Sequence, residues 1–138
     1  MGTNERRPVI LLVQPKRDDR DMYVEFLRHA GLTPIPVSRA SEAVRVAPHA
    51  DVIVTGVLLP GRVDGIEFVN QLKRSGRTSR IPVIVLTACA WKDERERALI
   101  AGCDVFLSKP CLPRVLAREI RRLLARDFPT PSLAPHAA

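Results

Sequence analysis

The sequence predicts an α/β domain: an open, doubly wound parallel sheet of five strands, in the order 2-1-3-4-5, covered by five helices. Short continuous apolar runs in the chain are typical of strands that are buried on both faces. Amphipathic stretches alternate with these runs, which indicates parallel strands joined by helical crossovers. The 138 residues suffice for one domain, which we expect over residues 8–127. Residues 128–138 are rich in Pro and Ala and are interpreted as a tail or a truncated linker.

The first third of the chain predicts a strand, a helix and an edge strand. Val9–Val13 is a compact run of β-branched residues and leucines, typical of a buried strand. The stretch after it has apolar residues at helical spacing. Asp18 or Asp19 is expected to cap its start, and Gly31 ends it. Thr33–Val37 is a short strand whose two prolines place it at an edge of the sheet.

The middle of the chain predicts a helix, a strand and a second helix. The short first helix opens at Ser41 and ends before Pro48, because proline cannot continue it. Val52–Val57 is the next strongly apolar strand. Gly65–Arg74 is expected to be helical, with its apolar side chains on one face.

The last elements complete the alternation. Val83–Leu86 is a continuous β run, Lys92–Ala101 is a helix before Gly102, and Val105–Leu107 is a brief strand. Leu112–Asp127 is a helix with a strong apolar stripe. Five such strands with right-handed crossovers fit the flavodoxin-like order 2-1-3-4-5, in which ligands bind at the carboxyl ends of the strands.

Composition and charge exclude several classes of protein. The chain has 22 basic and 15 acidic residues, a net charge of +7, and the excess lies in residues 73–80 and in the C-terminal segment. That local distribution does not fit a protein that coats nucleic acid over its whole surface. The polar start, the lack of a membrane-length apolar run and the unpaired cysteine spacing predict a cytoplasmic protein without membrane association. Three scattered histidines predict no metal cluster, and Cys89 and Cys111 are interpreted as packing residues rather than reactive thiols.

Three segments at the predicted strand ends resemble the receiver domain of two-component response regulators. They are Leu58–Gly65, Leu86–Ala88 and Gly102–Pro110, and the resemblance covers roughly Pro8 to Arg126. In that family an Asp at the end of the third strand takes a phosphoryl group from a histidine kinase, and two acidic residues after the first strand hold Mg²⁺. A Thr or Ser and a Lys contact the phosphoryl oxygens, and an aromatic residue changes rotamer with phosphorylation.

The resemblance assigns these roles to positions that this chain fills only in part. Gly56 stands at the phospho-acceptor position, and Gln14 and Pro15 stand at the acidic pair, so all three carboxylates are missing. The retained pocket residues, with the Lys109–Pro110 bond expected to be cis, are Thr87, Phe106, Lys109 and Pro110.

The missing carboxylates predict a loss of phosphorylation chemistry. Gly56 offers no nucleophilic oxygen, and Gln14 and Pro15 cannot neutralise a divalent cation. We therefore expect no phosphorylation, no Mg²⁺ or other metal, no cofactor and no enzymatic activity. Lys109 is expected to reach a backbone carbonyl or water, with an anion contact as the alternative. Asp18 and Asp19 are interpreted as residues that cap the helix and compensate its dipole.

Basic residues on the last predicted helix form a candidate partner-binding face. They are Arg114, Arg118, Arg121, Arg122 and Arg126. By resemblance, receivers commonly dimerise or bind effectors through the fourth helix, fifth strand and fifth helix, so the expected partner is an effector, a kinase or a second copy. A merely solvated face is the alternative, and the segment Lys73–Arg80 is interpreted as a solvated loop. Nucleic acid is a weaker candidate, because the chain has few aromatic residues and no recognition motif.

These observations together predict an atypical receiver domain that acts in signal transduction as a phosphorylation-independent protein-binding module. One alternative is a receiver that is still modified by an unidentified route. Another is a basic regulatory protein associated with nucleic acid. The residues alone name neither the partner nor the pathway.

Overall fold

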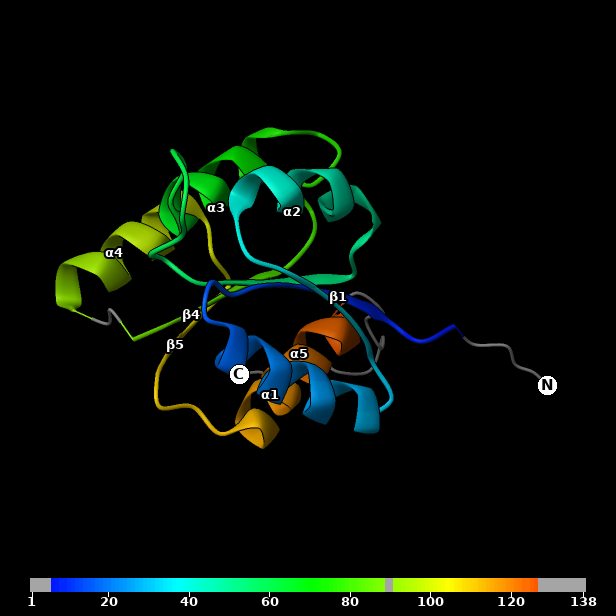
Figure 1. Cartoon of the computed structure of the whole chain (residues 1–138). Coiled ribbons are helices and arrows are strands. Elements are labelled where there is room, and N and C mark those ends of the chain that lie inside the picture. Colours follow the sequence, from blue (N-terminus) through cyan, green and yellow to red (C-terminus); the bar gives the residue numbers. More distant parts are fainter. Residues whose placement is uncertain (1–5, 89–90, 127–138) are drawn as a thin grey trace, which may run out of the picture.

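The fold is a parallel five-stranded sheet with helices on both faces, as the sequence predicts. The computed structural model describes residues 6–88 and 91–126. The strands are β1 (Val9–Val13), β2 (Thr33–Val37), β3 (Val52–Thr55), β4 (Val83–Thr87) and β5 (Val105–Ser108). Their spatial order is β2-β1-β3-β4-β5, and every neighbouring pair is parallel. The predicted doubly wound fold and its strand order are confirmed (Figure 1).

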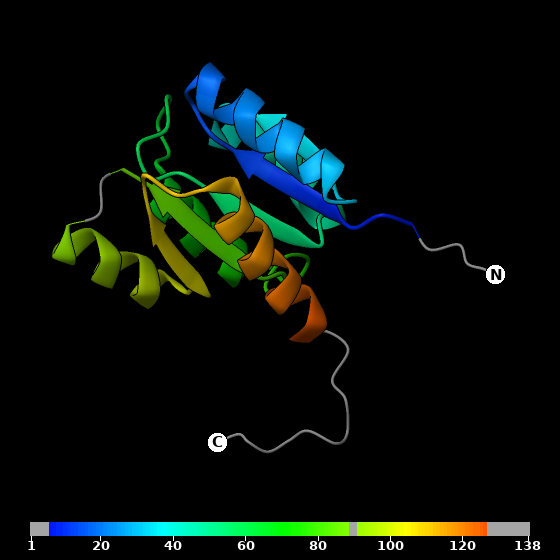
Figure 2. The same ribbon diagram turned by 90° about the horizontal axis from the view of Figure 1, so that it is seen from below.

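The helices divide between the two faces of the sheet. They are α1 (Arg17–His29), α2 (Ala40–Val46), α3 (Gly65–Arg74), α4 (Lys92–Ala101) and α5 (Pro113–Arg126), with a short 3₁₀ turn at Ala47–His49 after α2. Helices α1 and α5 pack on one face, and α2, α3 and α4 cover the other (Figures 1 and 2). Among the described residues no helix is long and apolar enough to cross a membrane.

Alternation along the strands produces two separate cores. Leu11 and Val13 of β1 point into the core under α2, α3 and α4, whereas Ile10 and Leu12 point into the core under α1 and α5. The same alternation holds in β3 and β4, because successive strand side chains face opposite sides of a sheet. Because these strands are buried on both faces, their sequences are continuous apolar runs.

Several predicted boundaries need correction. Strand β3 ends at Thr55 rather than at residue 57, because the backbone leaves the sheet at Gly56. Lys73 belongs to α3 and is not part of a solvated loop. Its ammonium donates to Ile81 O at 2.8 Å and lies 3.3 Å from the Asp104 carboxylate. The predicted tail at residues 128–138, and Asp127 at the expected end of the last helix, lie outside the described residues.

Candidate functional site

The candidate site lies where β1, β3, β4 and β5 end. In the sheet register Val13 of β1 pairs with Thr55 of β3, so Gln14 and Gly56, the next residues, leave the sheet side by side. A cavity of about 170 Å³ opens there, and Lys109 reaches it from beyond β5. The residues that line it are Gln14, Pro15, Lys16, Asp19, Gly56, Val57, Leu58, Leu86, Thr87, Ala88 and Lys109. The fold thus brings together most of the residues that sequence reasoning assigned to a pocket.

Gly56, the position of the missing phospho-acceptor, has room for a side chain. A Cβ built on it would lie 3.6 Å from the Gln14 amide nitrogen and 3.7 Å from Leu86 O, which are ordinary van der Waals contacts. Its φ lies outside the left-handed region that favours glycine. Neither sterics nor backbone conformation therefore requires glycine at this position.

Gln14 is buried completely and uses both ends of its amide. Its nitrogen donates to Leu86 O at 3.3 Å, which ties the end of β1 to β4. Its oxygen accepts a hydrogen bond from the Lys109 ammonium at 2.7 Å. A buried amide is stable only when its polar atoms are paired, and this one is paired on both sides.

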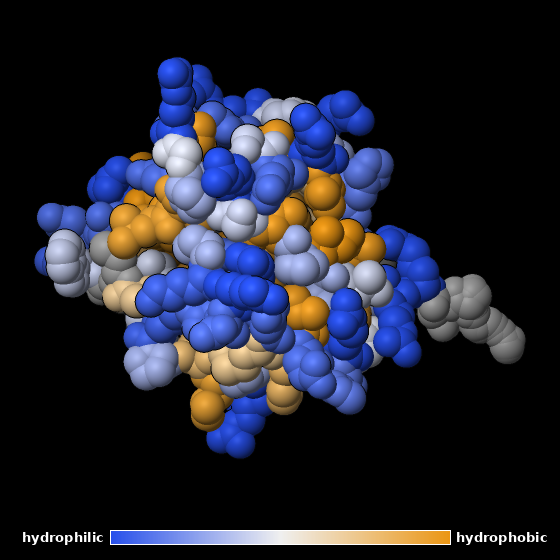
Figure 3. Space-filling view, viewed as in Figure 1, coloured by the Kyte–Doolittle hydropathy of each residue, from blue (hydrophilic) through white to orange (hydrophobic). Residues whose placement is uncertain are grey.

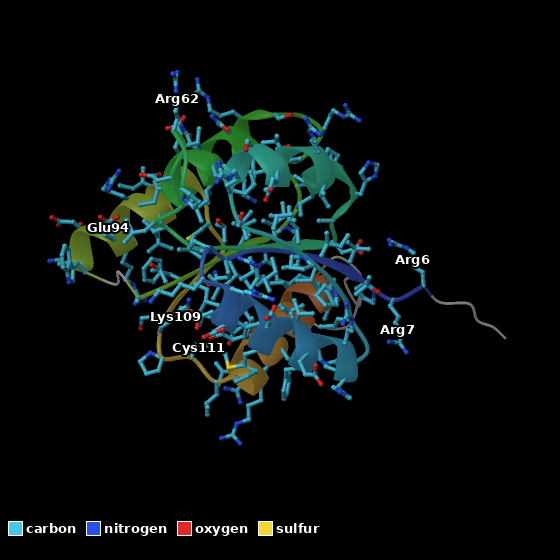
Figure 4. The ribbon with its side chains drawn as sticks, in the orientation of Figure 1. Arg6, Arg7, Arg62, Glu94, Lys109 and Cys111 are labelled. Atoms are coloured by element: carbon cyan, nitrogen blue, oxygen red, sulfur yellow. The ribbon has the colours of Figure 1, made fainter. Side chains whose placement is uncertain are left out.

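Lys109 is held by an ion pair that the sequence did not predict. Its ammonium lies 2.5 Å from the Asp19 carboxylate, and both side chains are largely shielded from solvent. The ammonium contacts the side chains of Asp19 and Gln14 rather than a backbone carbonyl. Figure 4 shows Lys109 beside the first turn of α1, with Cys111 following it toward α5.

Asp18 and Asp19 do not cap α1, although both lie in its first turn, where acidic side chains interact favourably with the helix dipole. The N-cap of α1 is Lys16, and it makes no side-chain capping bond. The Asp19 carboxylate points at Lys109. The only sequence signal for this pairing was the placement of an acidic residue early in the helix that follows β1, facing a lysine that follows β5.

An arginine of α1 holds the turn that follows β1. The Arg20 guanidinium donates to Gln14 O at 2.9 Å and to Pro15 O at 3.2 Å. These two carbonyls therefore face an arginine. Carbonyls engaged in this way are poorly placed to be cation ligands.

The other residues of this predicted set lie on β4, on β5 or directly after β5. Thr87 ends β4 and is buried, and the Lys109–Pro110 peptide bond is cis. Phe106 is half-buried on β5, and the Arg95 guanidinium of α4 lies over its ring, 5.8 Å from the ring centre. A cation over an aromatic face adds modest stability and favours one position of the ring.

The residues that line the pocket do not fit a magnesium ion. Mg²⁺ is bound in proteins through carboxylates and water in near-octahedral geometry. In residues 6–88 and 91–126, no group of three or more His, Cys, Asp or Glu side chains could hold a metal. The one carboxylate among the lining residues, Asp19, bonds to Lys109.

Cys111 lies close to the pocket without the features of a reactive thiol. Burial raises the pKa of the Cys111 thiol, which disfavours the nucleophilic thiolate. The backbone carbonyl of Cys111 accepts a hydrogen bond from the Tyr23 hydroxyl at 2.8 Å, and burial raises the pKa of Tyr23 to about 12. The hydrogen bond and the burial of these side chains show that α1 packs closely against the segment that leads into α5. Cys89 lies outside the described residues.

The five arginines of α5 do not form one free face. At about 100° per residue, Arg114, Arg118 and Arg121 lie within about 60° of one another, and Arg126 lies about 120° from Arg114. Arg121 donates to Ala30 O at the end of α1, Arg122 pairs with Glu119, and Arg126 lies 3.8 Å from Asp104. The predicted face is thus divided between the α1 side and the β5 side of the helix.

Comparison with known proteins identifies the family. The family model of the response regulator receiver domain matches residues 10–121. The chain is 34% identical over 122 residues to the phosphate regulon transcriptional regulatory protein PhoB of Escherichia coli K12, covering 87% of this chain and 53% of PhoB. It is 32% identical over 121 residues to response regulator Rre1 of Synechocystis, covering 86% of this chain and 52% of Rre1. The chain therefore spans about half the length of these curated relatives.

Solved structures give the same family. The signal receiver domain of a signal transduction histidine kinase from Syntrophus aciditrophicus superposes with a TM-score of 0.80 at 31% identity, over 94% of this chain and 98% of that one. The receiver domain of sensor histidine kinase PA1611 from Pseudomonas aeruginosa gives 0.79 at 30% identity, over 86% and 98% of the two chains. That second structure has a magnesium ion coordinated in its active-site cleft.

Proposed function

This chain belongs to the response regulator receiver domain family of two-component signalling, and we propose that it works there as a phosphorylation-independent protein-binding module. The family membership is shown by the comparisons, and the proposal is that the domain signals without phosphorylation. Under the proposal the domain transmits information through its presence and through the partner that it binds.

The contact between Lys109, Gln14 and Asp19 is the observation that carries the proposal. The retained lysine is the residue expected, by resemblance, to contact phosphoryl oxygens. Here its ammonium makes a 2.5 Å contact with Asp19 and a 2.7 Å contact with Gln14. A lysine that already has a carboxylate partner does not need a phosphoryl group to neutralise it.

The acceptor side of the reaction is also missing. Transfer to a protein needs a nucleophilic oxygen in line with the phosphorus, and Gly56 has none. Thr55 is adjacent, but its hydroxyl is buried and donates to Gly56 O at 3.0 Å. Asp19 supplies a carboxylate, yet that carboxylate is the partner of Lys109.

Mass spectrometry after treatment with a small phosphodonor tests the proposal. The full chain is incubated with acetyl phosphate and Mg²⁺, beside a receiver domain that is known to be phosphorylated. We expect a one-phosphate adduct on the control receiver only. A stable adduct on this chain would refute the proposal, and its loss in Asp19→Asn would then identify Asp19 as the acceptor.

A further inference from the structure

A groove follows the contact between α1 and α5, on the face of the sheet opposite α2, α3 and α4. Near the start of both helices it widens to a cavity of about 660 Å³. Farther along it continues as a cavity of about 330 Å³. The α1 residues that line the two cavities include Asp19, Met22, Tyr23, Phe26 and Ala30.

The two cavities follow one another along the same faces of α1 and α5. The α1 residues recur every three or four positions, so they lie along a single face of the helix. On α5 the lining runs in the same direction, from Pro113 through Ala117 to Arg121. A hydrogen bond from Tyr23 to Cys111 O joins α1 to the segment before α5, and one from Arg121 joins α5 to Ala30 O at the end of α1. From Asp19 to Ala30 the helix rises about 17 Å, or three turns.

Large apolar side chains lie exposed along this groove. Met22 is 44% exposed, Phe26 37% and Leu112 56%. Figure 3 shows an apolar patch over α1 and the start of α5, bordered by hydrophilic residues. Contiguous exposed apolar surface with a polar rim is typical of a protein-binding site.

The rim of the groove carries positive charge that the domain does not neutralise. Within residues 6–88 and 91–126, Arg114 and Arg118 make no hydrogen bond or ion pair, although both line the groove. The acidic side chains of α1 give little compensation. Of the four acidic side chains of α1, Asp19 pairs with Lys109 and Asp21 lies 3.8 Å from Arg17, whereas Asp18 and Glu25 do not line the groove.

We propose that this groove docks an acidic amphipathic helix of a partner protein. Apolar side chains of the partner, spaced three and four residues apart, cover Met22, Phe26 and Leu112, and its flanking carboxylates pair with Arg114 and Arg118. The inference rests on the proposed function as a binding module. It places the docking surface between α1 and α5, rather than on the face of α4, β5 and α5 suggested by resemblance.

A pair of designed peptides tests this docking mode. Each is a helix of about 14 residues with leucines at i, i+3 and i+7. One carries Glu on both flanks, and its twin carries Lys at the same positions. Each is titrated into the isotope-labelled full chain while backbone amide shifts are recorded. We expect the acidic peptide alone to bind, with shifts concentrated in α1 and α5.

Variants of the full chain locate the contacts. We expect R114E/R118E, and separately Phe26→Ala, to weaken binding of the acidic peptide by about tenfold or more. Arg45→Glu on α2 is the matched charge control, and Ile100→Glu on α4 is the control for the alternative face. Both controls are expected to bind as the unaltered chain does. Thermal melts show which variants remain folded.

Four outcomes would overturn the groove proposal. They are no shifts with millimolar acidic peptide, equal binding of the Lys twin, shifts centred on α4 and β5, and unchanged affinity in R114E/R118E. None of these bears on the proposed loss of phosphorylation, because the phosphodonor experiment measures that separately. Failure of one proposal is therefore distinguishable from failure of the other.

Discussion

Lys109→Met is expected to destabilise the domain, because the lysine satisfies two groups at once. Its loss leaves the oxygen of the buried Gln14 amide without a donor, which costs about 1–3 kcal/mol. It also removes the cation from Asp19, whose side chain is 31% exposed, at a cost of up to about 1 kcal/mol. Together the two losses amount to roughly 1–4 kcal/mol of unfolding free energy.

Thermal and urea unfolding measure this loss. For a domain of this size each kcal/mol lowers Tm by roughly 3–5 °C, so Lys109→Met should melt about 10 °C below the unaltered chain. Asp19→Asn keeps the bond between Lys109 and Gln14, and should lose only a few degrees. Lys92→Met, at an exposed position, is the matched control and should change Tm by about 1 °C or less.

One result would refute this structural account of Lys109. Suppose that Lys109→Met has the same Tm as the unaltered chain while Asp19→Asn has a lower one. The Lys109 ammonium then contributes nothing to the stability of the fold. The lysine would then be free for an incoming anion, and the argument for a phosphorylation-independent domain would lose its main support.

Three further predictions concern the packing and chemistry around the site. Gly65→Ala should be strongly destabilising in urea unfolding, because a Cβ there would lie 1.7 Å from Gly56 O, whereas Gly76→Ala, with no atom within 4 Å, should be neutral or stabilising. In an absorbance titration Tyr23, the only tyrosine, should ionise near its raised pKa of about 12 when folded and near 10 in urea. Because folding favours the neutral phenol, Tyr23 contributes its full stabilisation of the folded state below pH 10. That stabilisation, about 2–3 kcal/mol, is lost as the pH rises towards 12. Addition of Mg²⁺ should neither raise Tm nor quench the fluorescence of Trp91, and a saturable change would contradict the assignment of a metal-free pocket.

The sheet was predictable because its signals are local. Strands buried on both faces must be apolar throughout, so short apolar runs in the sequence predicted β1, β3 and β4. Right-handed crossovers restricted the topology to a doubly wound sheet, and five strands fitted the flavodoxin-like order. The error at β3 has a local cause: Val57 is apolar and buried, but it lies beyond the point where the chain turns away from the sheet at Gly56. An apolar run marks burial and does not mark hydrogen bonding.

The site was predictable in position and only partly in contacts. Strand ends and the resemblance located Gln14, Gly56 and Lys109 in one pocket, as the structure does. The partner of Lys109 depends on which way Asp19 faces once α1 has packed on the sheet. Two residues 90 positions apart meet only in the folded state. The same limit explains Lys73, which looked like part of a solvated loop but bonds across to Ile81 and Asp104.

Electrostatics links the missing residues to those that replaced them. Three absent carboxylates account for three of the seven net positive charges, and their loss would leave a half-buried lysine without an anion. Such a charge is costly to bury alone. Asp19 supplies one negative charge from a different element, and Gln14 supplies a neutral acceptor in place of a second carboxylate. The partly buried cation of the pocket, Lys109, is therefore neutralised within the domain by the anion Asp19. It follows that an Asp placed at residue 56 alone would compete with Asp19 for the same ammonium and would still lack the acidic pair that Mg²⁺ needs.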